Sequence, residues 1–391
     1  MRRRIVYSLA LLAMIVSFTA CSGKESAKSY YNAGMEALES EKYENAAAYF
    51  EKAIQLKDDK ADYYINYAAA LTMLGKYDEA IVQYDKAVPD VESSITDKNK
   101  KRALRGKGVI FYKQGEFAKA EELFKEALTM DTEKDLNEDI SCYLADTYMQ
   151  QEKYDQALAV VDRLLENEKE AYVYAIRAKI SVAKGDIEAA TKDYEEAIKL
   201  EKEDYTYYIL KYEMLKEAGK EDEANKSLED ALQLEAKSAK EKYQKAKVMC
   251  FQGNYEEAKT QLLAITGEYS KAYELLGDIY YANQDYSNAI DSYVTYLGVS
   301  QEHASPGLYN QLANCSIKLE SYEQALEYIN QGLSLGDNTA QRELKYNEVL
   351  VYENLGDFNK AYDLAVSYVS EYPEDENMAR ELVFLETRKT K

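Results

Sequence analysis

Apolar residues recur at helical spacing along almost the whole of this chain. From about residue 27 to residue 375 they return every three or four positions, in runs separated by short polar stretches. Such spacing places the apolar side chains on one face of an α-helix. The pattern therefore predicts a chain made of amphipathic helices joined by short turns, two helices to each repeated unit.

One short motif marks the start of the second helix in each of ten units. It usually holds an aromatic residue, two mostly polar residues and a closing alanine, as in Lys42–Ala46 and Asn254–Ala258. The closing alanines are Ala46, Ala80, Ala120, Ala157, Ala190, Ala224, Ala258, Ala289, Ala325 and Ala361, and they lie 31–40 residues apart. A period near 34 residues is typical of helical repeat arrays.

A second position repeats in register with the motif. Twelve residues before the closing alanine, eight units carry a small residue that lets two helices approach closely: Gly34, Ala68, Gly108, Ala145, Ala178, Ala246, Gly277 and Ala313. Tyr212 and Val349 break this rule in the sixth and tenth units. Four residues after the closing alanine, five units carry an aromatic: Phe50, Tyr84, Phe124, Tyr194 and Tyr293.

Glycine and proline lie where this pattern needs helices to end. Six glycines fall between paired helices, where a positive φ ends the first helix: Gly75, Gly115, Gly185, Gly219, Gly253 and Gly356. Pro89, Pro306 and Pro373 fall between units or at their ends. The segment Val91–Lys101 lengthens the third joint, and we predict a polar loop there.

These units resemble the tetratricopeptide repeat family over nearly the whole chain. The resemblance implies an all-α, right-handed superhelical solenoid of about ten helix pairs over residues 27–375, with a capping helix and tail over residues 376–391. The first-helix tryptophan typical of the family is absent, and tyrosines such as Tyr30 and Tyr64 stand in its place. The sixth unit also has Glu221 where an aromatic is expected.

The first twenty residues are of a different kind. Arg2, Arg3 and Arg4 precede an apolar run that ends at Phe18, which is too short for a comfortable membrane-spanning helix. This is the pattern of a secretory signal peptide, here residues 1–20. Phe18-Thr19-Ala20-Cys21 resembles the lipobox of bacterial lipoproteins, which implies that Cys21 is lipidated and that residues 21–26 form a short spacer. Plain secretion with a chance cysteine is the alternative.

Composition narrows the partners. The chain has 49 basic and 71 acidic residues and a formal net charge of −22, so it should repel nucleic acid and anionic lipid headgroups. Loss of the leader would remove three further positive charges. We therefore expect a protein or peptide partner and a membrane link through the lipid anchor, on the extracytoplasmic side of the cell membrane.

Residues for catalysis or metal binding are sparse. His303 is the one histidine of the sequence, and Cys142, Cys250 and Cys315 are too far apart to suggest a metal-ligand cluster. Asp131–Asn137 has some features of a calcium loop, but it lacks the glycine needed at the sixth position, so we read it as a polar turn. The sequence predicts no enzyme, no cofactor and no metal.

In the tetratricopeptide family the first helices line a concave groove, which implies ligand-binding positions here. They are Arg102, Arg105 and Tyr112 in the third unit, Lys240, Tyr243 and Lys247 in the seventh, and Lys271 in the eighth. Acidic residues such as Asp139 and Asp278 alternate with them. The alternative is that these are solvated helices with no ligand. The 38 tyrosines are likewise open to two interpretations, helix packing or recognition.

Some members of the family clamp a peptide carboxylate with lysine and asparagine. Asn310 and Asn314 stand at those positions in the ninth unit, but the lysine is missing, so that activity is not predicted. The leading functional hypothesis is a lipid-anchored extracytoplasmic scaffold or adaptor that binds a protein or peptide in its groove. A glycan-binding surface lipoprotein is the alternative, although sugar sites usually stack on tryptophan and this chain has none.

Overall fold

The computed structural model describes residues 26–88, 94–167, 169–300, 304–335 and 339–389. Within these ranges every regular element is helical, namely twenty-one α-helices and one short 3-10 helix, η1 (Lys134–Leu136). The predicted all-α arrangement of ten helix pairs is confirmed. The proposed leader, Cys21, Pro89 and His303 lie outside the described residues.

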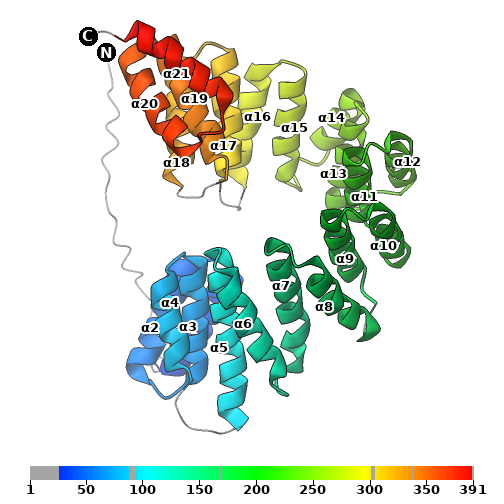
Figure 1. Cartoon of the computed structure of the whole chain (residues 1–391), viewed down its shortest axis with the longest axis vertical. Helices are drawn as coiled ribbons and strands as arrows, with labels where there is room; N and C mark the ends of the chain where they lie inside the picture. Colours follow the sequence, from blue (N-terminus) through cyan, green and yellow to red (C-terminus); the bar gives the residue numbers. More distant parts are fainter. Residues whose placement is uncertain (1–25, 89–93, 168, 301–303, 336–338, 390–391) are drawn as a thin grey trace. The chain divides into compact units, whose positions relative to one another are not determined.

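The chain divides into two compact units, one ending at Lys169 and one beginning at Glu170. The first unit holds α1 (Ala27–Glu39), α2 (Tyr43–Leu56), α3 (Ala61–Met73), α4 (Tyr77–Lys86), α5 (Ser94–Lys113), α6 (Phe117–Thr129), α7 (Asn137–Gln150) and α8 (Tyr154–Asn167). The second holds α9 (Ala171–Lys184), α10 (Ile187–Leu200), α11 (Tyr205–Glu217), α12 (Glu221–Leu232), α13 (Ala239–Phe251), α14 (Tyr255–Leu263), α15 (Lys271–Ala282), α16 (Tyr286–Val299), α17 (Pro306–Lys318), α18 (Tyr322–Ser334), α19 (Gln341–Asn354), α20 (Phe358–Glu371) and α21 (Glu376–Arg388). In each unit the two helices of a pair lie side by side, joined by a short turn (Figure 1).

The paired helices meet where a small residue faces a large one. A Cβ atom on Gly34 would lie 2.6 Å from the Phe50 ring, and one on Gly108 would lie 2.5 Å from the Phe124 ring. Gly277 meets the ring of Tyr293 in the same way, at 2.3 Å. These glycines are therefore required by the close approach of an aromatic ring from the second helix.

The two exceptions in the sequence follow the same rule in reverse. Tyr212 is only 4% exposed and shares a cluster with Leu228, which occupies the place of the second-helix aromatic. Val349 is fully buried in a cluster that contains Ala365 at the equivalent place. A larger residue on the first helix is thus matched by a smaller one on the second, which keeps the packed volume similar.

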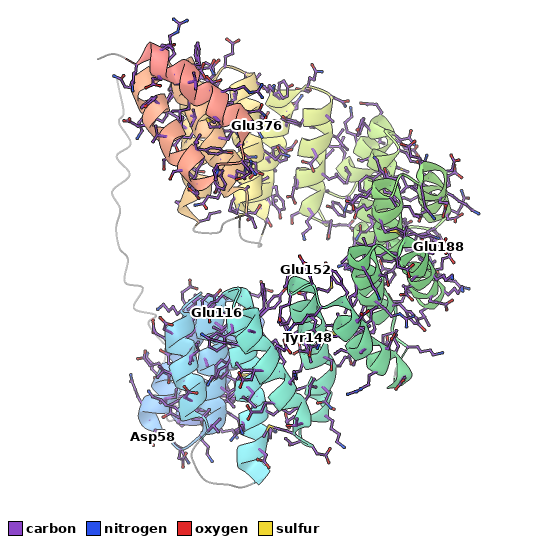
Figure 2. All side chains as sticks on the ribbon, viewed as in Figure 1. Asp58, Glu116, Tyr148, Glu152, Glu188 and Glu376 are labelled. Carbon is purple, nitrogen blue, oxygen red and sulfur yellow. The ribbon has the colours of Figure 1, made fainter. Side chains whose placement is uncertain are left out.

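A residue with a positive φ angle follows the first helix of each of the ten pairs. All six glycines predicted in these turns have φ between 72° and 86°, which confirms their role. Glu41, Glu152, Gln284 and Glu320 take the same left-handed conformation without being glycine, with φ between 57° and 60°. Figure 2 shows Glu152 at the turn after α7, and Glu116 immediately before α6.

The prediction of a polar loop over Val91–Lys101 is wrong for residues 94–101, which form the first turns of α5. Lys101 is fully buried, and its Nζ lies 3.2 Å from the carbonyl oxygen of Met130, 2.6 Å from that of Thr132 and 2.6 Å from Asn137 Oδ1. Burial lowers the pKa of this ammonium group. The polar sequence of residues 94–101 suggested a loop, because the sequence does not distinguish a buried lysine that binds three oxygens from a solvated one.

The last helix, α21, covers the apolar face of the tenth pair. Met378 and Leu385 are fully buried in the cluster around Val349 and Ala361. Asp375 caps α21 by accepting hydrogen bonds from the backbone N–H groups of residues 377 and 378, both at 3.1 Å. None of the helices in the described ranges is long and apolar enough to cross a membrane.

The cap should loosen in acid. The backbone N–H of Met378, the Tyr368 hydroxyl and the Arg342 guanidinium all favour the carboxylate and lower the pKa of Asp375 to about 2. Because the folded pKa is below the unfolded value of about 3.9, Asp375 stabilises the cap above that value and the contribution is lost as the pH falls towards 2.

We therefore expect α21 amides to lose protection between about pH 6 and about pH 2.5, relative to α20 amides, in hydrogen exchange corrected for intrinsic rates. Asp375→Asn should lower the protection at the higher pH and remove most of this pH dependence. Equal pH dependence in α21 of the variant and the wild-type chain would refute the assignment.

Candidate functional site

The predicted groove residues fall on one face of the first helices. Arg102, Lys240 and Lys271 each stand 18 residues before the closing alanine of their unit, and Arg105 and Tyr243 stand 15 before it. Lys247 stands 11 before it. Offsets that differ by three and four keep these side chains on one helical face.

In the first compact unit, which ends at Lys169, the predicted residues contact acidic side chains of neighbouring first helices. Arg102 on α5 forms an ion pair with Asp62 on α3. Arg105 binds Asp139 on α7 through two hydrogen bonds of 2.6 and 3.0 Å, which raise the pKa of the arginine. Arg102 and Arg105, two residues of the predicted groove, are therefore neutralised by aspartates of the same chain.

Tyr112 is held in the same network. Its hydroxyl donates a hydrogen bond to Asp146 on α7, and its ring packs edge-on against Tyr143, with the centroids 6.0 Å apart. Burial, and then the Asp146 carboxylate, raise the pKa of Tyr112. Arg105 also lies over the Tyr143 ring, 5.8 Å from its centroid. These contacts hold the predicted groove residues of α5 against α7.

The second compact unit, which begins at Glu170, places its predicted basic residues differently. Lys240 is exposed and forms no ion pair within the described residues. It borders a cavity of about 450 Å³ whose lining also includes Tyr205, Lys202 and four acidic residues, Glu201, Glu203, Asp204 and Glu241. Lys247, two turns further along α13, lies 5.6 Å from the centroid of the Phe251 ring.

Tyr243 and Lys271 complete the predicted set. Tyr243 is half-buried beside Tyr269, with the ring centroids 5.1 Å apart. Burial, and then the charge of Glu274, raise the pKa of its hydroxyl. Lys271 is half-buried at the first residue of α15. All four predicted residues of the second compact unit therefore lie on α13 or at the start of α15.

A second cavity of about 450 Å³ lies further along the same unit. Its lining comes from α15, α16, α17 and α19 and includes Asp278, Tyr293, Asn310, Gln311 and Glu343. The Tyr293 hydroxyl donates a 2.7 Å hydrogen bond to Asp278. Asp278 keeps an exposed edge, yet its partial removal from water raises the pKa of its carboxyl group.

Three asparagines join the first helices next to this cavity. The Nδ2 atom of Asn347 on α19 donates to Asn310 Oδ1 at 2.8 Å and to Asn314 Oδ1 at 2.9 Å, both on α17. Sequence reasoning singled out Asn310 and Asn314 but missed Asn347 and Glu343. The signal was available, because Glu343 has the same offset from its closing alanine as Lys240.

The three cysteines of the described helices have raised thiol pKa values. Burial raises the pKa of the Cys142 and Cys250 thiols to about 11 and that of Cys315 to about 12, so all three are protonated near neutrality. No group of three or more potential metal ligands occurs in the described part of the chain.

Comparison with known protein families identifies the family to which the repeated helix pairs belong. Family models described as tetratricopeptide repeat match residues 27–60, 59–133, 111–180, 171–204, 243–307 and 306–336. The chain carries tetratricopeptide repeats. The matched ranges do not include α11 and α12, the pair in which Tyr212 and Glu221 depart from the family pattern, nor α19, α20 and α21.

Similar proteins share the repeats over part of their length. The Hsp70-Hsp90 organizing protein of Triticum aestivum is 32% identical over 238 residues, which cover 58% of this chain and 38% of that protein. Hsp70-Hsp90 organizing protein 3 of Arabidopsis thaliana is 29% identical over 237 residues, which cover 58% of this chain and 39% of that protein. The chain thus spans about two fifths of these relatives.

Among solved structures, yeast Tom70 is similar, with 13% identity, a TM-score of 0.43 and coverage of 93% of this chain and 95% of that one. Tetratricopeptide repeats form protein-interaction scaffolds and are typically not enzymes.

Proposed function

We propose that this protein is a lipid-anchored, extracytoplasmic scaffold or adaptor whose tetratricopeptide repeats bind a protein or peptide in the groove of the first helices. The observation that carries the proposal is in the second compact unit, which begins at Glu170. There, Lys240 and Glu343 on the predicted groove face each border a cavity of about 450 Å³, and neither of these two residues forms an ion pair within the described residues. Such cavities suit side chains of an extended segment.

The anchor rests on the sequence around Cys21. The charged start, the apolar run and the lipobox-like Phe18–Cys21 support acylation of the cysteine after cleavage. Two or more acyl chains hold a protein stably on a membrane, since each buried methylene contributes about 0.8 kcal/mol. Because α1 begins at Ala27, a spacer of residues 21–26 would keep the first repeat within roughly 25 Å of the bilayer.

The organising roles named for the plant relatives are not part of this proposal. The chain matches about two fifths of those proteins. In addition, Asn310 and Asn314 direct their carbonyl oxygens to Asn347, and no lysine accompanies them at the positions where family members clamp a peptide carboxylate. A partner held along the groove by several side chains fits this chain better.

Replacing the anchor residue tests the cellular part of the proposal. Cys21→Ser should leave an uncleaved precursor or move the protein out of the membrane fraction, because serine cannot carry the thioether-linked lipid. Fractionation and immunoblotting measure both outcomes, and Cys250→Ser is the matched control. Normal processing and membrane retention of Cys21→Ser would refute lipidation at this residue.

Replacing the groove cations tests the binding part. Changing Arg102, Arg105, Lys240 and Lys247 to alanine should abolish capture of partners that the wild-type tethered protein labels by proximity biotinylation, without changing helicity. The physical reason is that exposed charge pairs are each worth about 0.2–1 kcal/mol, so several must be lost together.

The same experiment on the second-helix residues Lys125 and Lys192 provides the control, and capture should persist. The lysine pair Lys240 and Lys247 should account for most of the loss, because Arg102 and Arg105 are already paired with Asp62 and Asp139. Equal behaviour of the groove and second-helix sets would show that the groove is not the binding surface.

A further inference from the structure

A buried carboxylate oxygen of the capping helix α21 lacks an N–H or hydroxyl donor. Glu381 stands three residues after Met378 and four before Leu385, so it shares the helical face that these two fully buried residues turn to the tenth pair. Its Oε1 atom is buried, and no N–H or hydroxyl group of the described residues donates a hydrogen bond to it. An unpaired buried acceptor is unfavourable, so the neighbours of this oxygen decide how the cap is held.

The neighbour of Glu381 is a second carboxyl group. Glu353 is half-buried on α19, eight residues before the closing alanine Ala361. A hydrogen bond joins the carboxyl groups of Glu353 and Glu381. Two ionised carboxylates have no proton to donate, so this contact requires that one of the two groups be protonated. Helices α19 and α21 therefore meet through two acids that share one proton.

Positive charge does not replace this proton. No lysine or arginine in the described part of the chain forms an ion pair with Glu353 or Glu381. The cations on α19, on α20 and on α21 with its C-cap all have other recorded partners: Arg342, Lys345, Lys360, Arg380, Arg388 and Lys389. Of the other helices packed against α19, α17 has one charged residue, Lys318, and α18 has two, Glu323 and Glu327; all three are exposed.

Acids and tyrosines surround the pair. Burial, and then the charges of Asp375 and of the two glutamates, raise the pKa of Tyr346 on α19. From α20, the Tyr368 hydroxyl donates a 2.8 Å hydrogen bond to Asp375, and Asp363 is exposed. Removing the shared proton would therefore place two negative charges together in acidic, partly dry surroundings, which is unfavourable.

Protonation of Glu353 follows from these surroundings. Burial, and then the charge and the hydrogen bond of Glu381, raise the pKa of Glu353. Because the folded pKa lies above the unfolded value of about 4.3, the contact stabilises the docked cap fully below that value, and its contribution is lost as the pH rises through the raised pKa. Asp375 acts in the opposite direction at lower pH, since its pKa in the folded chain is about 2. The two effects together make the cap most stable in mildly acidic solution.

We propose that α21 is a proton-controlled cap, which docks on the tenth pair while Glu353 and Glu381 share one proton and loosens when that proton is lost in mildly alkaline solution. The connection from α20 to α21 is short, residues 372–375, so a loosened α21 stays tethered beside its docking face. Loosening withdraws Met378 and Leu385 from the cluster around Val349. The apolar end of the repeat array is therefore covered in mildly acidic solution and open in alkaline solution.

Hydrogen exchange of the full chain at about pH 5 and about pH 8 tests the proposal. After correction for intrinsic rates, the protection of α21 amides should be about threefold or more greater at the lower pH, with α17 amides as the reference. Asp375 does not contribute to this difference, because its carboxyl group is ionised in the folded and in the unfolded chain at both pH values.

Glutamine in place of either acid should hold the cap in alkaline solution. Glu381→Gln should raise the protection of α21 at the higher pH and remove most of the difference between the two pH values, because the amide can donate to the Glu353 carboxylate without a shared proton. Glu353→Gln should do the same with donor and acceptor exchanged. The double variant should lose no further pH dependence, since both changes remove the same proton.

Glu386→Gln is the matched control, because it removes one carboxylate from the same helix at a side chain that is 63% exposed. This variant should keep the difference in α21 protection between the two pH values. Circular dichroism checks that the helical content of each variant is unchanged. Equal protection of wild-type α21 at both pH values, or a pH difference that Glu381→Gln retains in full, would overturn the proposal.

Discussion

Lys101→Met is expected to destabilise the third and fourth helix pairs by about 3 kcal/mol or more. The Lys101 ammonium is fully buried and serves three oxygens, those of Met130, Thr132 and Asn137 Oδ1. Methionine fills a similar volume but donates no hydrogen bond, and each buried acceptor left without a partner costs about 1–3 kcal/mol. Because repeats contact mainly their neighbours, the loss should be local to α5, α6 and α7.

Hydrogen exchange over α5–α7, together with urea unfolding, measures this effect. The control is Lys100→Met, since the side chain of Lys100 is 43% exposed and forms a surface ion pair with Glu126 at 2.7 Å. Surface pairs of this kind contribute about 0–1 kcal/mol, so the control should be nearly neutral. Similar small effects in both variants would mean that the Lys101 ammonium does not organise the turn after α6.

This lysine also shows where sequence reasoning stops. The closing alanines predicted ten helix pairs, because they recur at a regular period and because apolar residues at every third or fourth position indicate an α-helix. The stretch Val91–Lys101 carried no such spacing, and its charges suggested a loop. The same charges gave no hint that the turn Asp131–Asn137 is organised around a lysine ammonium from α5. Long-range partners of a polar residue are not encoded in its local pattern.

The sequence predicted which helix face carries the candidate residues, but not which of them form ion pairs. Offsets from the closing alanines placed Lys240, Tyr243 and Lys247 on one face, and the structure has them on α13. The sequence did not reveal that Arg102 and Arg105 pair with Asp62 and Asp139, because those contacts join residues 40 and 34 positions apart. Both ends of each pair were visible in sequence, but their distance in space was not.

Exchanging volume between the two helices of a pair should rescue a severe packing defect. Phe124→Ala is expected to destabilise the third pair by about 3–5 kcal/mol, because the fully buried ring leaves a cavity. Gly108→Val alone should cost about 1–3 kcal/mol or more, since its Cβ would lie 2.5 Å from that ring.

The double variant, Gly108→Val with Phe124→Ala, copies the arrangement of Val349 and Ala365 in the tenth pair. It should be more stable than the sum of the single changes predicts by about 2 kcal/mol, because the valine occupies space that the ring has vacated. Urea unfolding with hydrogen exchange over α5 and α6 completes this double-mutant cycle. Gly298→Val is the control, because no heavy atom lies within 4 Å of the Cβ position there and helix propensity alone is changed. If the two changes add without coupling, then the small and large residues of a pair do not compensate each other. In that case Tyr212 and Val349 are tolerated for reasons specific to their own units.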